Sequence, residues 1–93
     1  MLDENMSKSD LERELDEKGD FIQIDLINKF LDRSSGLKRD TKKFLFLRLA
    51  EIYEKLLEMG LDFQERKEIK EKLLKLYEKL GEIRKYESLK GLK

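Results

Sequence analysis

Two consecutive stretches of this chain decide its fold. They read TKKFLFLRLAEIYEKLLEMG at residues 41–60 and DFQERKEIKEKLLKLYEKLGEI at residues 62–83. In each stretch, apolar residues recur at alternating spacings of four and three, which is the heptad pattern of an amphipathic helix. The two apolar seams are Leu45, Leu49, Ile52, Leu56 and Met59 in the first stretch, and Ile69, Leu73, Leu76, Leu80 and Ile83 in the second.

The connection between these two helices is short. Gly60 stops the first helix, and Asp62 with Glu65 has the spacing of a capping box at the start of the second. About two residues then separate the helices, and so short a connection forces neighbouring helices to lie antiparallel. We therefore expect an antiparallel αα-hairpin, interrupted at Gly81 because glycine disfavours a helix interior.

The first helix of the hairpin carries a second apolar row beside its seam. The row is formed by Phe46, Ala50, Tyr53 and Leu57. A stripe of this width exceeds that of a simple coiled coil and implies contact with more than one neighbouring helix. We expect the helix over residues 20–33 to close the open groove of the hairpin.

The N-terminus is predicted to hold one short acidic helix. Residues 1–8 lack periodicity and are expected to be a disordered terminus. Ser9, with Glu12 three residues later, then marks an N-cap. Gly19 would end this helix in the left-handed conformation that glycine adopts at little cost.

A second helix is expected from Asp20, as its N-cap, to Arg33. Residues 21–26 also alternate as a strand would, but no second alternating run exists for them to pair with. Residues 34–36, Ser-Ser-Gly, mark the boundary before the hairpin.

The chain is therefore predicted to be all-α, a small three- or four-helix bundle built on the antiparallel αα-hairpin. Its length fits one domain over residues 9–93. Within it, residues 9–33 form the acidic and apolar N-terminal helices, and residues 41–89 form the hairpin with a C-terminal extension.

The composition excludes most kinds of catalytic site. The 93 residues include no Cys and no His, which excludes disulfides, thiolate or imidazole metal sites and the commonest general base. Paired carboxylates such as Asp16 with Glu17, or Glu65 with Glu68, have the spacing of a solvated helix surface and not of a catalytic cleft. We expect no catalytic residue, no metal, no cofactor and no small-molecule substrate, and hence no enzyme.

The chain shows no signal for export or for a membrane. It lacks a basic N-terminal region followed by an apolar one, and no stretch approaches the ~18 apolar residues of a membrane span. We therefore expect a cytoplasmic protein. The chain contains two Asn and two Gln but 15 Lys and 13 Glu, and this composition resembles that of hyperthermophile proteins.

The expected function follows by elimination. We expect a protein–protein interaction, adaptor or assembly module that binds another protein or itself as a homodimer. The helix over residues 20–33 is apolar around much of its circumference, so it must bury more than one face. The candidate partner-binding surface is Phe21, Ile22, Leu26, Phe30, Phe46 and Tyr53.

A basic loop over residues 33–43 indicates an alternative, a nucleic-acid-associated accessory protein. Its candidate phosphate or nucleic-acid contacts are Arg33, Lys38, Arg39, Lys42 and Lys43. Such a loop before a helix N-terminus presents N–H groups and positive potential, which can hold a phosphate backbone without reading its sequence. The other interpretation is that these side chains belong to a solvated linker or pair with the acidic N-terminal helix. Residues 1–32 carry ten acids and four bases, whereas residues 33–93 carry eleven acids and seventeen bases.

One helix resembles a known repeat family. The residues that carry the resemblance are Phe46, Leu49, Ala50 and Tyr53. Their spacing is similar to that of the first helix of a tetratricopeptide repeat, a helical hairpin that binds peptide segments. The resemblance covers this helix alone, because Arg66 stands where the second helix of that family has a small residue.

Overall fold

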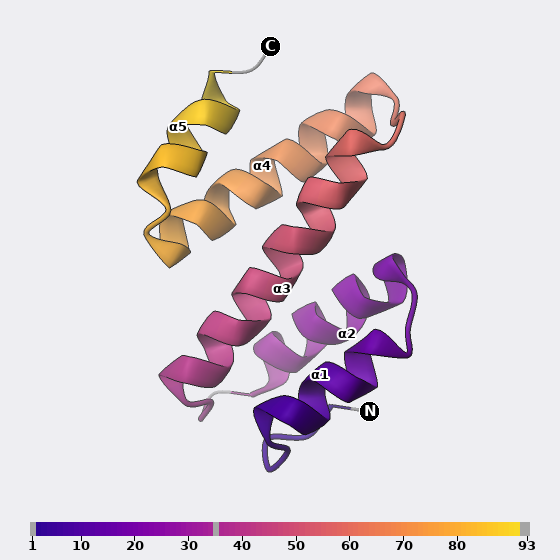
Figure 1. Cartoon of the computed structure of the whole chain (residues 1–93), viewed down its shortest axis with the longest axis vertical. Helices are drawn as coiled ribbons and strands as arrows, with labels where there is room; N and C mark the ends of the chain where they lie inside the picture. The colour runs from indigo at the N-terminus through magenta and orange to yellow at the C-terminus, as the bar shows by residue number, and fades with distance from the viewer. Residues whose placement is uncertain (1, 35, 92–93) are drawn as a thin grey trace. The chain divides into compact units, whose positions relative to one another are not determined.

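The computed structural model describes residues 2–34 and 36–91, and regular structure in these residues is entirely helical. In the described residues the helices are α1 Lys8–Asp16, α2 Asp20–Arg33, α3 Arg39–Glu58, α4 Phe63–Leu80 and α5 Ile83–Lys90 (Figure 1). The all-α prediction is confirmed. The predicted disordered terminus, the 34–36 boundary and the 9–93 domain each include residues outside the described ones, namely Met1, Ser35, Leu92 and Lys93.

The chain forms two compact units, Met1–Leu45 and Phe46–Lys93, here called unit 1 and unit 2. Unit 1 contains α1, α2 and the start of α3, and unit 2 contains the rest of α3 with α4 and α5. The expected closure of the hairpin groove by residues 20–33 concerns residues of different units and stays a prediction.

Unit 1 has a small apolar core. Its buried apolar side chains are Leu2, Leu11, Leu15, Ile27, Phe30 and Leu45. The chain reverses between α1 and α2 (Figure 1), and Arg33 Nη2 at the end of α2 donates to the carbonyl oxygen of Leu2 at 3.5 Å. Gln23 is also buried, and its Nε2 donates to the carbonyl oxygen of Lys18 at 2.8 Å. This polar group is therefore satisfied inside the core.

The first helix begins earlier than its sequence pattern predicts. Ser7 is the N-cap, and its Oγ accepts a hydrogen bond from the backbone N–H of Asp10 at 3.2 Å. The predicted cap, Ser9, lies inside α1. Both serines can cap a helix that buries Leu11, so the spacing of apolar residues does not distinguish between them.

Gly19 does not end α1, which corrects the sequence prediction. The backbone N–H of Lys18 donates to the carbonyl oxygen of Leu15 at 3.0 Å and closes the helix through right-handed residues. Gly19 instead has φ −70 and ψ 165 and is the N-cap of α2, so Asp20 is the first helical residue and not the cap. No left-handed residue is needed at this turn.

Unit 2 buries part of both predicted seams, namely three of the five residues of the first and two of the five residues of the second. Its buried apolar side chains are Leu49, Ala50, Ile52, Tyr53, Leu56, Leu73, Leu76, Tyr77 and Leu89. Fully burying one leucine contributes roughly 1.5–3 kcal/mol, so these side chains supply the main stabilisation of the unit. Met59 and Ile83 are 52% and 69% exposed, because α3 ends at Glu58 and α4 ends at Leu80.

The start of α4 follows the predicted capping pattern, whereas Gly81, predicted to interrupt a helix interior, is the C-cap of the helix. Asp62 accepts a hydrogen bond from the backbone N–H of Glu65 at 2.8 Å, and this bond holds the pKa of the Asp62 carboxyl below its ordinary value. At the other end Gly81 has φ 73, and the N–H of Glu82 donates to the carbonyl oxygen of Tyr77 at 2.9 Å. This is a Schellman motif, and α5 begins directly after it.

None of the helices in the described part of the chain combines the length and the apolar character needed to cross a membrane.

We expect Gly81→Ala to lower the free energy of unfolding by about 1 kcal/mol, because alanine would have to hold a left-handed backbone. A Cβ at position 81 meets nothing within 4 Å, so the cost comes from the backbone and not from a clash. Gly60→Ala is the matched control, since a Cβ there also meets nothing within 4 Å and its φ is not positive. Urea denaturation followed by circular dichroism measures both, and equal effects would contradict the prediction.

Candidate functional site

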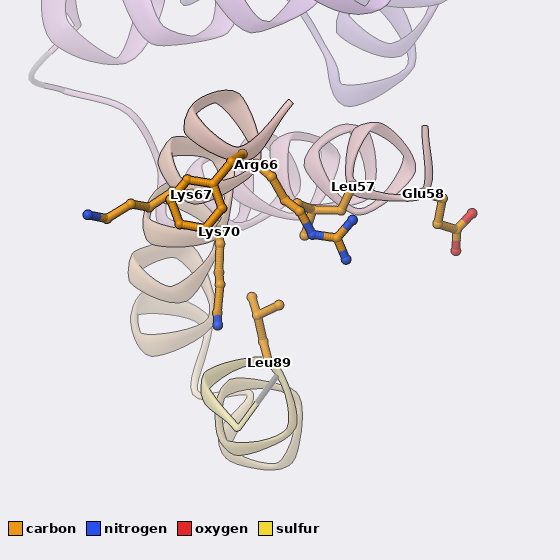
Figure 2. A pocket seen from close by; sticks show the side chains of 7 residues that line it. Leu57, Glu58, Arg66, Lys67, Lys70 and Leu89 are labelled. Carbon is orange, nitrogen blue, oxygen red and sulfur yellow. The ribbon is translucent and has the colours of Figure 1, made fainter. Parts of the chain in front are cut away.

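An open hollow in unit 2 brings apolar and basic side chains together (Figure 2). Its volume is about 470 Å³. It is lined by Leu57 and Glu58 of α3, by Phe63, Arg66, Lys67 and Lys70 of α4, and by Leu89 of α5. We call it the basic pocket, because three cations and one carboxylate line it.

The first turns of α4 place the basic side of the pocket. Phe63, Lys67 and Lys70 lie on one helix face because they are spaced by four and three residues. The Asp62 cap fixes where this face begins. Figure 2 shows Lys70 reaching toward Leu89, whereas the amino group of Lys67 points away from it. The amino groups of Lys67 and Lys70 therefore point in different directions (Figure 2).

The apolar part of the pocket is only partly covered. The ring of Phe63 is 82% exposed, and Leu57 is partly buried, whereas Leu89 is 8% exposed. Glu58 points away from Lys70 and Leu89 in Figure 2. The pocket thus offers an apolar surface lined by three cations and one carboxylate.

A hydrogen bond and an ion pair, which share one carboxylate, connect the three helices that line the pocket. The hydroxyl of Tyr77 on α4 donates to Oε2 of Glu54 on α3 at 2.8 Å, and Lys85 Nζ on α5 lies 4.0 Å from the same oxygen. Lys85 Nζ is also 6.0 Å from the centroid of the Tyr77 ring. Burial, together with the hydrogen bond to Glu54, raises the pKa of Tyr77 above its ordinary value. The contacts of Lys85 thus link α5 to both α3 and α4.

The basic pocket was not predicted from the sequence. Arg66, Lys67 and Lys70 have the spacing of an ordinary solvated helix face, which gave no reason to single them out. The usable signal was Phe63, an aromatic residue that directly follows the capping Asp62 and falls outside the heptad seam. A large apolar side chain that lies outside the seam is not expected to be buried in the predicted core.

The predicted partner-binding residues lie in different environments. Phe21 and Ile22 are 68% and 54% exposed at the start of α2 in unit 1. Leu26 of unit 1 and Phe46 of unit 2 are partly buried. The two others, Phe30 and Tyr53, are buried in the cores of their units and offer no exposed surface. The exposed part of the predicted surface is therefore the pair at residues 21–22.

The predicted nucleic-acid contacts all lie on the surface of unit 1. The exposed residues of this set are Arg33, Lys38, Arg39, Lys42 and Lys43. Arg33 donates to the carbonyl oxygen of Leu2, and the lysines lie just before and within the first turns of α3. The acid Asp40, also exposed, lies among them.

Comparison of this chain with protein-family models, with curated proteins and with solved structures found no match. Among the residues described, no group of three or more acidic side chains is arranged to hold a metal ion.

We expect Tyr77→Phe to lower the free energy of unfolding by about 1 kcal/mol at neutral pH, because the hydrogen bond to Glu54 is lost. The folded-state pKa of Tyr77 is raised above its ordinary value of 10.0, so its contribution is complete below pH 10.0 and is lost as the pH rises further. The difference between the two chains should therefore shrink above that pH.

Urea denaturation over a series of pH values measures this difference. Tyr86→Phe is the control, because Tyr86 lies on α5 outside the cluster of Tyr77, Glu54 and Lys85. A difference between Tyr77→Phe and the unaltered chain that stays constant with pH would refute the assignment.

Proposed function

We propose that this chain is a non-enzymatic protein–protein interaction module. Its basic pocket binds an apolar side chain flanked by carboxylates on a partner protein. The observation that carries the proposal is the 82% exposed ring of Phe63 beside three cations. Aromatic residues and arginine are enriched at protein interfaces, where they supply much of the binding energy.

The chemistry of the pocket favours an acidic protein segment. Covering Phe63 and Leu57 removes apolar surface from water, which stabilises a complex with an apolar side chain. Arg66, Lys67 and Lys70 attract anionic partners and disfavour basic ones. A nucleic-acid backbone would satisfy the cations but would leave the apolar surface uncovered.

The antiparallel hairpin of α3 and α4 is the scaffold in this proposal. Two contacts support it. Lys79 Nζ lies 5.3 Å from the centroid of the Phe46 ring, and Tyr77 contacts Glu54. The earlier residue of α3 thus meets the later residue of α4, as antiparallel packing requires.

A second candidate function is contact with nucleic acid through the basic loop, residues 33–43. The exposure of all five cations in this segment supports it. The contact would be electrostatic and independent of sequence, since backbone phosphates are its only target. It would use a surface in unit 1, separate in sequence from the basic pocket.

A labelled helical peptide tests the proposed pocket. We expect a fluorescein-labelled peptide with Phe and Leu one turn apart among Glu residues to bind, and its counterpart with Lys in place of Glu not to bind. The double substitution Arg66→Glu with Lys67→Glu should weaken binding by about tenfold or more, as measured by fluorescence anisotropy.

The matched control is Lys72→Glu with Lys75→Glu, which reverses two exposed charges on α4 outside the pocket. We expect this pair to have a much smaller effect. Equal loss in both double variants would show general electrostatic attraction and would exclude the pocket as the binding site.

Retention on single-stranded DNA tests the second candidate. We expect Lys38→Glu with Lys42→Glu to abolish any salt-dependent retention, whereas Lys72→Glu with Lys75→Glu retains it, because only the first pair lies in the basic loop. Failure of the unaltered chain to bind the column at about 50 mM salt would exclude this function.

A further inference from the structure

Unit 1 exposes one adjacent pair of large apolar side chains. Of the large apolar residues described in this unit, only Phe21 and Ile22 are exposed. They lie in the first turn of α2, and the core of the unit uses other residues of that helix, Ile27 and Phe30. The pair therefore contributes exposed apolar surface that the folding of unit 1 does not require.

The surroundings of this pair are acidic. Residues 16–25 contain four acids and one base. Glu17 and Asp25 are exposed on either side of the pair in sequence, and Asp20 immediately precedes it. Phe21 and Ile22 are thus apolar side chains flanked by carboxylates, which is the kind of ligand that the chemistry of the basic pocket favours.

The two surfaces are complementary in charge and in apolar character. One offers two exposed apolar side chains among four acids and one base, and the other offers Phe63 and Leu57 beside three cations and one acid. We propose that Phe21 and Ile22 of one copy of this chain occupy the basic pocket of a second copy. The proposal rests on the proposed function and names its partner, a second copy of the same chain.

The size and symmetry of this contact define how it should behave. The surface that inserts differs from the surface that receives, so the contact is heterologous, and copies join in a closed ring or in an extending chain. A contact centred on two side chains buries less than the ~1,200 Å² of a stable interface. We therefore expect reversible association at high protein concentration that weakens as salt is added.

Sedimentation equilibrium from micromolar to millimolar protein tests the contact. The unaltered chain should associate with increasing concentration. Phe21→Ser, and separately Arg66→Glu with Lys67→Glu, should each weaken association by about tenfold or more. These side chains are exposed, so circular dichroism should show unchanged folding. Ile83→Ser is the control for Phe21→Ser, because Ile83 is 69% exposed and lies outside both surfaces.

A mixing experiment tests whether the contact joins two different surfaces. The Phe21→Ser chain keeps its basic pocket, and the Arg66→Glu, Lys67→Glu chain keeps Phe21. Each variant alone should associate more weakly than the unaltered chain, whereas an equimolar mixture with one chain fluorescently labelled should form a mixed complex, as measured by fluorescence-detected sedimentation. A mixture that stays monomeric, or a Phe21→Ser chain that associates as the unaltered chain does, would overturn the proposal.

The peptide experiment separates this proposal from the proposed function. If the acidic peptide binds the pocket but the unaltered chain stays monomeric throughout the concentration range, the function stands and self-association is wrong. If the chain associates through both surfaces, the mixing experiment supports the inference without reference to the peptide.

Discussion

Burial of the leucine-rich seams of α3 and α4 is the interaction on which unit 2 depends. Charged residues make up 45% of the chain and apolar residues 39%, so few side chains are available for a core. The seams concentrate them on one stripe of each helix, and Leu56 and Leu73 are each 1% exposed as a result. Charged residues therefore occupy the outward faces of the helices, and the cations of the basic pocket lie on such a face. Loss of the seams would remove the scaffold that holds Arg66 and Lys67 near Phe63.

The heptad spacing, with the capping residues, was sufficient to predict α4. Asp62 and Gly81 lie at the two ends of α4. The start of the helix uses a side-chain acceptor, which Asp62 supplies, and the end uses a left-handed backbone, which glycine adopts readily. The same reasoning was wrong for Gly19, since an extended backbone at an N-cap is open to any residue and leaves no specific signal. The capping-box spacing of Ser9 with Glu12 was likewise misleading for the start of α1, where Ser7 is the N-cap.

The basic pocket could not be predicted from periodicity, because periodicity reports only which residues a helix buries. The pocket depends on where α5 turns after Gly81 and brings Leu89 next to α4, and α5 makes contacts such as that of Lys85 with Glu54. Such contacts join residues far apart in sequence. For a related reason, the partner-binding surface predicted over residues 21–30 is larger than the one that is exposed. Phe30 is buried in the core of unit 1, whereas Phe21, nine residues earlier, is exposed.

The charge distribution distinguishes between the kinds of partner. The chain has no net charge, yet residues 1–32 carry ten acids and four bases, and residues 33–93 carry the balancing excess of bases. A nucleic acid would be attracted by one of these segments and repelled by the other, so part of its electrostatic attraction would be cancelled. A partner with charges of both signs is attracted by each segment, because each segment attracts the partner's charges of opposite sign. A second copy of this chain carries charges of both signs, with an excess of acids in residues 1–32 and an excess of bases in residues 33–93.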